Sequence, residues 1–526
     1  MGYGTLRQDD SSQNTTLASA PDPEDGSEEF EIHAQSISLL KTSVVIAGLA
    51  GVSFANSMST GLLIASLPVM TEDLQIPDYL LICPYSIYSL TTCCCLLFAG
   101  SVADLVGPRT VNLLGSLVTS LSMLSSSLAS NGTQIILFRG VQGVGVSMCL
   151  PTAVSIMTHT FHRGRCRTFG FSCLGLAVPF GFSVGLVIGG ILTTASERWR
   201  LGWSICAGIV FILLLLNIWT LPSDENLNDL TWKKFKSATD WVGVLIATLC
   251  LGSLSYLCAV LNESFENIYK VQNILLLMSA ILLVPAFVIR MASQAWRKRP
   301  VLIPNSLWRK KSFAGICMMV FLAWAALSGE EVFLSLFYQE IQDLSPAQAS
   351  LRLLPNIIPG ITIPPLVGLF VHHIRAHHLL VSTSVISTIP CFMMAVIDPT
   401  SSYWLSSFWA VFLGPVSVDV IFVIAHLIII DAFPAQTHAL AGAVFNTMTQ
   451  LGPLVGLSVT AMCSHYVTAN AGGDTKQGLL KGYRAAFWAA GVMMVLTCGV
   501  SLVGFGGVGK LGGAVGKEEG GVVEED

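Results

Sequence analysis

The chain has 526 residues, of which 53% are hydrophobic and only 11% are charged, and its formal net charge at pH 7 is -5. Roughly a quarter of the residues are charged in an average soluble domain, so this composition excludes a soluble globular protein and predicts an all-α polytopic membrane protein. The small negative charge excludes a large basic surface of the kind that binds nucleic acid.

Residues 1–39 are polar and acidic, and they contain no apolar run typical of a cleavable signal peptide. Too little apolar surface is available there to offset the entropy of ordering the chain, so we expect a disordered tail. Fourteen apolar runs follow, each near the ~20 residues that cross a hydrocarbon core about 30 Å thick. They lie at 42–66, 79–99, 110–130, 133–157, 168–193, 201–221, 240–261, 272–290, 312–338, 347–370, 379–398, 403–430, 439–463 and 484–506.

The loops between these runs differ in charge. Most lysine and arginine residues fall in the loops that lie on the same side as the two termini. Because cytoplasmic loops hold the excess of these residues, both termini are predicted to be cytoplasmic. The sequons at Asn131 and Asn262 then fall in outer loops, where N-glycosylation is expected.

A tight polar turn, Gly100-Ser-Val-Ala-Asp104-Leu-Val-Gly107-Pro-Arg109, separates the second run from the third. The glycines permit a sharp reversal, Asp104 is suited to a helix N-terminus or a cation, and Arg109 is suited to bridging a neighbouring helix. An ordinary solvated turn is the alternative interpretation.

Arg139 lies a few residues inside the fourth run, shortly before Gln142, Gly143 and Gly145. A charge within hydrocarbon costs at least a few kcal/mol, so we expect Arg139 to face a polar cavity or a partner. The alternative is an arginine that reaches the outer interface from near a helix end.

The fifth run contains a glycine ladder, formed by Pro179, Gly181, Gly185, Gly189 and Gly190. Small residues four apart let two helix backbones approach closely, and a proline bends a helix. Any closely packed helix shows such a ladder, so the pattern by itself does not assign a function.

Three acids lie within later apolar runs: Glu330, Glu331 and Asp419. Burial favours the neutral form of a carboxyl group, which a reversible proton carrier needs. These acids are therefore candidates for proton coupling. A structural partnership with Arg352 or His426 is the alternative.

Two groups of metal-ligand residue types occur in short inner loops beside arginines, where polar interfacial residues are expected; they are His159, His162 and Cys166, and His372, His373, His377 and His378. No metal site and no cofactor are predicted from them. No Ser-His-Asp or paired-carboxylate arrangement stands at an outer mouth, so the sequence does not predict an enzyme.

Together these motifs resemble the major facilitator superfamily, and within it the fungal drug:proton antiporter-like transporters with fourteen spans, a group that includes aminotriazole-resistance and low-affinity ammonium transporter-like proteins. The turn is similar to the Gly-x-x-x-Asp-x-x-Gly-Arg-Arg signature, with Pro108 in place of the first arginine. The ladder is similar to the antiporter signature Gly-x-x-x-Gly-Pro-x-x-Gly-Gly, with Leu186 at the usual proline position. The first run ends Leu67-Pro68-Val-Met-Thr-Glu72-Asp73-Leu74, as in the family, but Ser59 replaces an acid that often stands nine residues before the proline.

The resemblance implies the major facilitator fold, with two six-helix halves and, here, an inserted helix pair, in a 6+2+6 order. The expected parts are a cytoplasmic tail at 1–39, a six-helix bundle at 40–221, a cytoplasmic linker at 222–239, the inserted pair at 240–290, a basic loop at 291–311, a second bundle at 312–506 and a tail at 507–526.

The resemblance also implies a function. We expect a secondary active exporter, with a role in multidrug resistance, that moves a small organic molecule such as a drug, toxin or secondary metabolite outward in exchange for protons. The turn would hold the outward-facing state, and Arg139 would tune a nearby acid. The substrate would bind between the halves near aromatic residues, of which the candidates are Phe54, Phe180, Phe182, Trp324, Phe333 and Phe337. Lipid-facing or packing positions are the alternative for most of these residues.

Two alternatives remain open at this point. The shifted proline and the absent first-span acid favour a low-affinity importer or uniporter of a small inorganic or ammonium-like solute. A receptor that senses without transport is the other, although the sequence offers no long inner regulatory domain to support it. We expect a monomer in the plasma membrane, with the vacuolar membrane as the alternative location.

Overall fold

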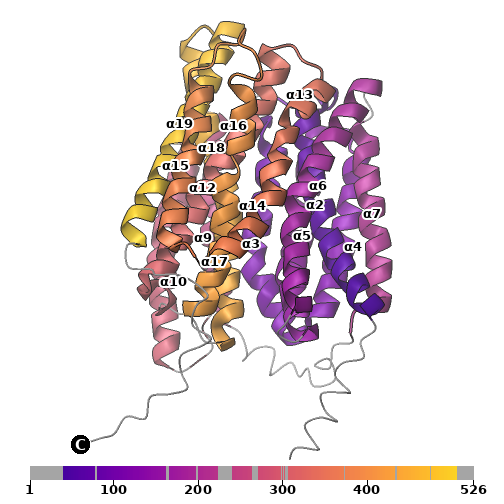
Figure 1. Cartoon of the computed structure of the whole chain (residues 1–526), viewed down its shortest axis with the longest axis vertical. Helices are drawn as coiled ribbons and strands as arrows, with labels where there is room; N and C mark the ends of the chain where they lie inside the picture. The colour runs from indigo at the N-terminus through magenta and orange to yellow at the C-terminus, as the bar shows by residue number, and fades with distance from the viewer. Residues whose placement is uncertain are drawn as a thin grey trace, which may run out of the picture. The chain divides into compact units, whose positions relative to one another are not determined.

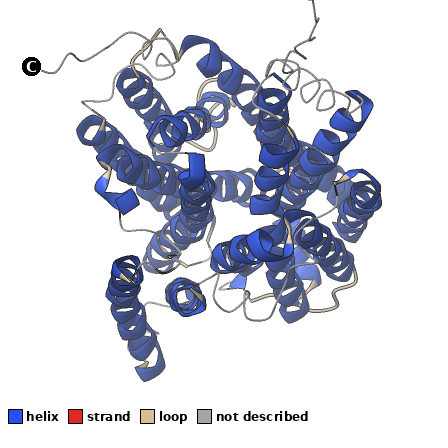
Figure 2. Ribbon diagram, turned by 90° about the horizontal axis from the view of Figure 1, so that it is seen from below, coloured by secondary structure: helices blue, strands red, loops and turns tan. Residues whose placement is uncertain are grey.

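The computed structural model describes residues 39–77, 80–161, 165–196, 199–222, 240–263, 270–297, 299, 301, 306–371, 373–432, 435–473 and 475–505. Within these ranges the chain forms helices, turns and short connections and contains no strand (Figure 2). The predicted all-α class is therefore confirmed. The two predicted tails and nearly all of the predicted linker lie outside the described residues.

Six helices form what we call the first helix group: α2 (Leu39–Asp73), α3 (Cys83–Val106), α4 (Pro108–Ser127), α5 (Gly132–Thr160), α6 (Arg165–Ser196) and α7 (Trp199–Thr220). The boundary between α3 and α4 follows from local chemistry. Gly107 adopts a φ of 112°, which glycine tolerates, and Pro108 occupies the first turn of α4, where its missing N–H leaves no helical bond unmade.

The second helix group contains α12 (Lys311–Leu336), a π turn η4 (Phe337–Ile341), α13 (Pro346–Leu353), a 3-10 turn η5 (Leu354–Asn356), α14 (Ile357–Phe370), α15 (Ala376–Ala395), α16 (Ser407–Leu413), α17 (Val416–Ala432), α18 (Ala435–Asn470) and α19 (Lys476–Gly504). The remaining helices are α9 (Trp241–Glu263), α10 (Val271–Trp296) and the single turn α11 (Ser306–Arg309). Figure 1 shows the first group on the right and most of the second on the left, with α13 and α14 beside α6.

Two of the predicted spans are interrupted in the structure. The span expected at 347–370 contains the 3-10 turn η5 around Pro355, and the span expected at 403–430 divides at Gly414-Pro415. Proline lacks the backbone N–H that a continuous helix needs, which explains both positions. In the described part of the chain, 10 helical stretches are long and apolar enough to cross a membrane, with a shorter apolar helix at Trp241–Leu254. The count of fourteen therefore stays a prediction.

Apolar clusters join the two helix groups. We name the ends by residues: the Asp73 end holds Asp73 and Arg200, and the Arg109 end holds Arg109 and the start of α12. One apolar cluster joins both groups at the Asp73 end, including Leu62 and Trp203 with Phe333 and Tyr338. A second cluster joins Leu97 of α3 to the start of α12 and other residues of the second group, whereas a third, around Ile46 and Met157, contains residues of the first group alone. Apolar packing therefore joins the two groups through more than one cluster.

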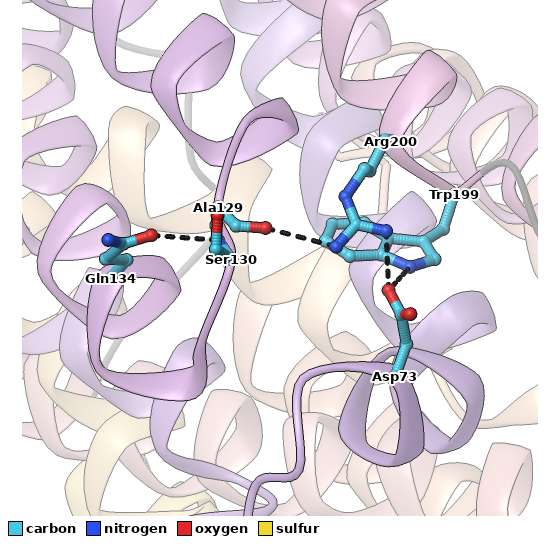
Figure 3. A network of polar contacts seen from close by, with 6 residues as sticks. All are labelled: Asp73, Ala129, Ser130, Gln134, Trp199 and Arg200. Carbon is cyan, nitrogen blue, oxygen red and sulfur yellow. Dashed lines mark hydrogen bonds and ion pairs between the residues drawn. The ribbon is translucent and has the colours of Figure 1, made fainter.

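A polar network ties three loops of the first group together at the Asp73 end (Figure 3). One carboxylate oxygen of Asp73 accepts hydrogen bonds from Trp199 Nε1 at 3.0 Å and from Arg200 Nη1 at 2.5 Å. Arg200 also donates to the carbonyl oxygen of Ala129 at 3.1 Å. The ends of α2, α4 and α7 are thereby fixed to one another.

The helix pair α9–α10 occupies the range predicted for the inserted pair. Helix α9 packs against both α3 and α18, and Thr248 of α9 donates to the carbonyl oxygen of Cys94 at 3.2 Å. Arg290 of α10 forms an ion pair of 2.8 Å with Asp240, whose side chain is 1% exposed. This ion pair joins the two helices at the Arg109 end.

We expect Asp240→Asn to lower the unfolding free energy by about 1–3 kcal/mol, because it leaves Arg290 without a counter-charge beside a buried site. Thermal unfolding of the purified protein in detergent measures this effect. Asp73→Asn is the matched control, since its ion pair with Arg200 is about 40% exposed and exposed pairs contribute about 0–1 kcal/mol. Equal melting temperatures for Asp240→Asn and the unmodified protein would contradict the expectation.

Candidate functional site

Arg139 of α5 is completely buried in the first helix group. Its Nε donates to the carbonyl oxygen of Pro84 at 3.1 Å, and its Nη1 donates to Gln142 Oε1 at 2.8 Å. The guanidinium carbon lies 4.4 Å from the ring centroid of Tyr88 and 5.3 Å from that of Trp203. Oriented dipoles and aromatic faces, rather than an adjacent carboxylate, stabilise this cation. The predicted alternative, an arginine that reaches the outer interface, does not fit this burial.

The interactions of Arg139 continue into α2. Gln142 Nε2 donates to Ser59 Oγ at 2.9 Å, and Ser59 donates to the carbonyl oxygen of Asn56 at 2.7 Å. Ser59 is the residue that stands where an acid was expected by resemblance. In this chain a hydroxyl therefore connects the first span to the buried cation.

Tyr85 of α3 links the first helix group to the second. It is buried, it hydrogen-bonds with Ser328 of α12, and it lies close enough to both Arg139 and Glu331 to feel their charges. Glu331 is half-buried, and its Oε1 accepts a hydrogen bond of 2.8 Å from Asn356 Nδ2 in the 3-10 turn η5. Tyr85 is therefore within electrostatic range of a cation in the first group and of a carboxyl group in the second.

Asp419 lies in the first turn of α17 and is also half-buried. Its charge interacts with that of Glu331, and its Oδ2 has no hydrogen-bond partner in the described structure. The structure therefore places two of the three predicted acids, on α12 and α17, within electrostatic range of each other. His426 was predicted as a partner of Asp419, but its side chain lies outside the described residues.

Glu330 points elsewhere, although it is adjacent to Glu331. It is only 3% exposed, and its Oε2 accepts a 3.5 Å hydrogen bond from the thiol of Cys391 in α15. Neighbouring residues on a helix point about 100° apart, so two consecutive acids reach different surroundings. Glu330 faces the interior of the second group, and Glu331 faces the boundary between the groups.

Arg352 was an alternative partner for these acids. Its Nη1 instead donates to Gln342 Oε1 at 2.5 Å, and its guanidinium lies 5.6 Å from the ring of Tyr338 and 5.3 Å from that of Tyr403. The hydroxyl of Tyr403 in turn donates to the carbonyl oxygen of Arg352 at 2.8 Å. Arg352 therefore connects loops at the Asp73 end, and in the described structure it contacts Gln342, Tyr338 and Tyr403 instead of the three acids.

The glycine ladder of α6 packs directly on α2. A Cβ atom at Gly181 would overlap the backbone of Phe54, and one at Gly185 would overlap the backbone of Met58. Gly189 also faces α2, where a Cβ atom would lie 2.9 Å from the Cα of Leu62. Gly190, by contrast, faces α13 of the second group, where a Cβ would lie 2.5 Å from Ser350 Oγ.

Pro179 of the ladder meets Gly360 of α14, at which a Cβ would lie 2.6 Å from the Cβ of Pro179. Beside this contact a shallow apolar groove opens between α2, α6 and α14. Two of the predicted aromatic residues, Phe54 and Phe180, line it, and their ring centroids are 5.6 Å apart. Phe333 and Phe337, also predicted to line a cavity, are buried in the apolar core instead.

Comparison with known proteins gives the family. The profile of the Major Facilitator Superfamily matches residues 49–457 and 332–508. The chain belongs to the Major Facilitator Superfamily. It is similar to MFS-type transporter 1 of Pyricularia oryzae, with 34% identity over 91% of this chain and 86% of that protein. It is also similar to the methylenomycin A resistance protein of Bacillus subtilis, with 27% identity over 79% of this chain and 88% of that protein.

Solved structures agree on the fold of this facilitator. The nucleoside transporter NupG, as a D323A mutant, matches with a TM-score of 0.59 and 13% identity, over 88% of this chain and 100% of that chain. The family and structural relatives are membrane transporters and not enzymes. The protein is therefore a multi-pass integral membrane transporter, and members of this superfamily carry small molecules, often with protons.

The superfamily turn lies between α3 and α4 of the transporter. Arg109 donates to the carbonyl oxygen of Ile218 at 2.7 Å, in the last turn of α7, where a cation also complements the helix dipole. Gly107 has the positive φ that its position needs, whereas Gly100 is not crowded, since a Cβ there would meet only Pro151 at 3.9 Å. The side chain of Asp104 lies outside the described residues. A role of this turn in holding the outward-facing state stays a prediction.

The two predicted glycosylation sites differ in what the structure describes. Asn131 is exposed, and its Oδ1 caps α5 by accepting a hydrogen bond from Gln134 N at 2.9 Å. The side chain of Asn262 lies outside the described residues. Glycosylation of either residue stays a prediction.

Several residues of the site were not predicted from the sequence. Tyr85, Tyr88 and Asn356 contact the predicted charged residues, but tyrosine and asparagine are common enough in apolar runs to give no signal alone. A usable signal exists for Asn356, because it follows Pro355 inside a predicted span and thus marks a break next to a polar side chain.

Proposed function

We propose that this facilitator is a secondary active exporter that moves a small organic molecule outward in exchange for protons by alternating access. The observation that carries the proposal is the pair of half-buried carboxyl groups, Glu331 and Asp419, at the boundary between the helix groups. Intramembrane acids are costly, and they mark ion or proton pathways when they face an interior path. Arg139 acts on the same site through Tyr85.

The packing of the helix groups supports alternating access. With the termini in the cytoplasm, the Asp73 end, where one apolar cluster joins the two helix groups, faces outward. Among the described residues, the polar contacts across the boundary at the Asp73 end include a 3.0 Å hydrogen bond from Ala347 N to Thr194 Oγ1 and one of 3.2 Å from Ser335 Oγ to the carbonyl oxygen of Ile64. Such contacts are readily exchanged when one group rocks against the other.

The direction and the finer classification belong to the same proposal. Export is supported by the glycine ladder, which resembles the antiporter signature, and by a relative that is named a resistance protein. We further propose fourteen spans in a 6+2+6 order, cytoplasmic termini, a monomer and a location in the plasma membrane.

Transport in everted plasma-membrane vesicles tests the proposal, with a panel of fluorescent cationic, neutral and anionic drugs as probes and an imposed pH gradient as the driving force. We expect gradient-driven uptake of at least one probe. Glu331→Gln and Asp419→Asn should each lower it by about tenfold or more, the size of a typical coupling free energy. Both variants keep side-chain shape but cannot release a proton.

Glu72→Gln is the matched control, because Glu72 is an exposed acid at the end of α2. It should transport like the unmodified protein. Probe uptake that ignores the pH gradient would contradict proton exchange. Full gradient dependence in both site variants would remove Glu331 and Asp419 from the coupling mechanism.

A further inference from the structure

The connection between α16 and α17 contains an inserted hydroxyl group. In a regular helix Ser417 N would donate to the carbonyl oxygen of Leu413, four residues earlier. Here Ser417 N donates to Ser387 Oγ of α15 at 2.9 Å, and Ser387 Oγ donates to the Leu413 carbonyl oxygen at 2.9 Å. One side chain from another helix thus bridges the two backbone groups. Pro415 lies inside the interrupted turn, and an inserted side chain at a proline is a recognised cause of a kink.

A second contact supports the kink from α12. Both carboxyl oxygens of Glu330 face Gly414, at which a Cβ atom would lie 3.4 Å from Oε2 and 3.6 Å from Oε1. Cys391 of α15, one helical turn beyond Ser387, holds the same carboxyl group through its thiol. The kink is therefore enclosed by two neighbouring helices.

Asp419 lies one turn beyond the kink, so the direction that α17 takes at the kink sets the position of its side chain. The backbone N–H of Asp419 donates to the carbonyl oxygen of Pro415 at 3.0 Å, so the first turn of α17 begins at the kink itself. Any rotation at Gly414-Pro415 moves the carboxyl group of Asp419 relative to Glu331 on α12.

Few other ionisable groups bear on this pair. Among the described side chains of the helices packed on α17, α12 contributes Glu330 and Glu331 near the kink, α14 has no ionisable side chain, and α15 contributes Cys391 near the kink. Helix α18 carries Cys463, His465 and Tyr466 near its C-terminal end, and Tyr85 of α3 is within electrostatic range of Glu331. Tyr338 in η4 is close enough to Glu330 to feel its charge. The separation between Asp419 and Glu331 is thus the main geometric variable.

We propose that Ser387 and Glu330 are positioning residues, which hold the kink of the α16–α17 span and thereby set the place of Asp419 beside Glu331. The value of this placement for transport rests on the proposed proton exchange. The placement itself can be measured without any transport substrate.

The experiment labels the purified protein in detergent with dicyclohexylcarbodiimide, which modifies protonated carboxyl groups in apolar surroundings. Peptide mass spectrometry then gives the pH of half-maximal modification of Asp419. We expect Ser387→Ala to shift this pH by about one unit, because the distance to a like charge sets how readily a carboxyl group binds a proton. Gly414→Leu should shift it as well, since a side chain that extends beyond the Cβ position, which lies 3.4 Å from Glu330 Oε2, displaces Glu330 without a change of charge.

Ser384→Ala is the matched control. Ser384 lies on the same face of α15, and its hydroxyl donates to the Leu380 carbonyl oxygen of its own helix at 2.7 Å. Its contact with the α16–α17 span is a long one of 3.4 Å to the side-chain oxygen of Ser417 and does not bridge backbone groups. It should leave the labelling of Asp419 unchanged, and Ser387→Thr, which keeps a hydroxyl group, should restore most of the original pH.

The proposal is overturned if Asp419 in Ser387→Ala is labelled at the same pH as in the unmodified protein, or if Ser384→Ala shifts it equally. If Ser387→Ala yields no folded protein, an unchanged labelling pH in Gly414→Leu overturns it alone. Absence of proton-driven transport in vesicles, by contrast, would refute the proposed function and leave this positioning intact.

Discussion

Replacing Gly185 with leucine should prevent the transporter from folding or lower its unfolding free energy by about 3 kcal/mol or more. A Cβ atom at this position would overlap the backbone oxygen of Met58, and Gly181, one turn away, lies just as close to Phe54. Backbone atoms cannot rotate aside as a flexible side chain does, so α6 would have to separate from α2. That separation would remove contact along the whole glycine ladder.

Gly175→Leu is a matched control on the same helix, because no atom lies within 4 Å of the place where its Cβ would stand. The yield of monodisperse protein in detergent and its melting temperature measure both variants. Gly175→Leu should behave like the unmodified protein. A normal melting temperature for Gly185→Leu would show that α2 and α6 are not held at this distance.

The helical architecture was predictable because the physical requirement is strong. A segment that crosses lipid must satisfy its backbone hydrogen bonds internally, so long apolar runs become helices. The two interrupted spans were less predictable. Pro355 and Pro415 mark both breaks in the sequence, but proline also occurs inside unbroken helices here, as Pro151 does in α5. Whether a proline divides a span depends on neighbours such as Ser387 that replace the lost backbone bond.

The site was predicted as a set of residues but not as an arrangement. A charged residue in an apolar run is conspicuous, so Arg139, Glu331 and Asp419 were found from the sequence. The sequence did not predict which of these residues lie at the boundary between the helix groups and which lie inside one group, because that depends on which face each helix turns to its neighbours. Glu330 and Glu331 illustrate this point, because adjacent and identical residues meet Cys391 in one case and Asn356 in the other.

Replacing Arg139 with lysine should lower transport by about 100-fold or more while the protein still folds and reaches the membrane. Lysine keeps a positive charge, but it lacks the planar fork that reaches the Pro84 carbonyl oxygen and Gln142 together and stacks on Tyr88. The proposed influence of Arg139 on Glu331, by way of Tyr85, would then shift with the flexible ammonium group. Arg139→Ala should lose transport as well, and at a greater cost in stability, because it leaves buried acceptors without a donor.

The measurement is transport in everted vesicles, corrected for the amount of folded protein, with melting temperature in detergent as the second readout. Arg200→Lys provides the control, since Arg200 is about 40% exposed at the Asp73 end and has no contact with the acids of the site. It should transport normally. If Arg139→Lys also transports normally, then any buried cation suffices at this position, and the proposed influence by way of Tyr85 does not require the geometry of a guanidinium group. If Arg139→Lys instead melts far below the unmodified protein, Arg139 serves the packing of α3 and α5 and has no separate part in coupling.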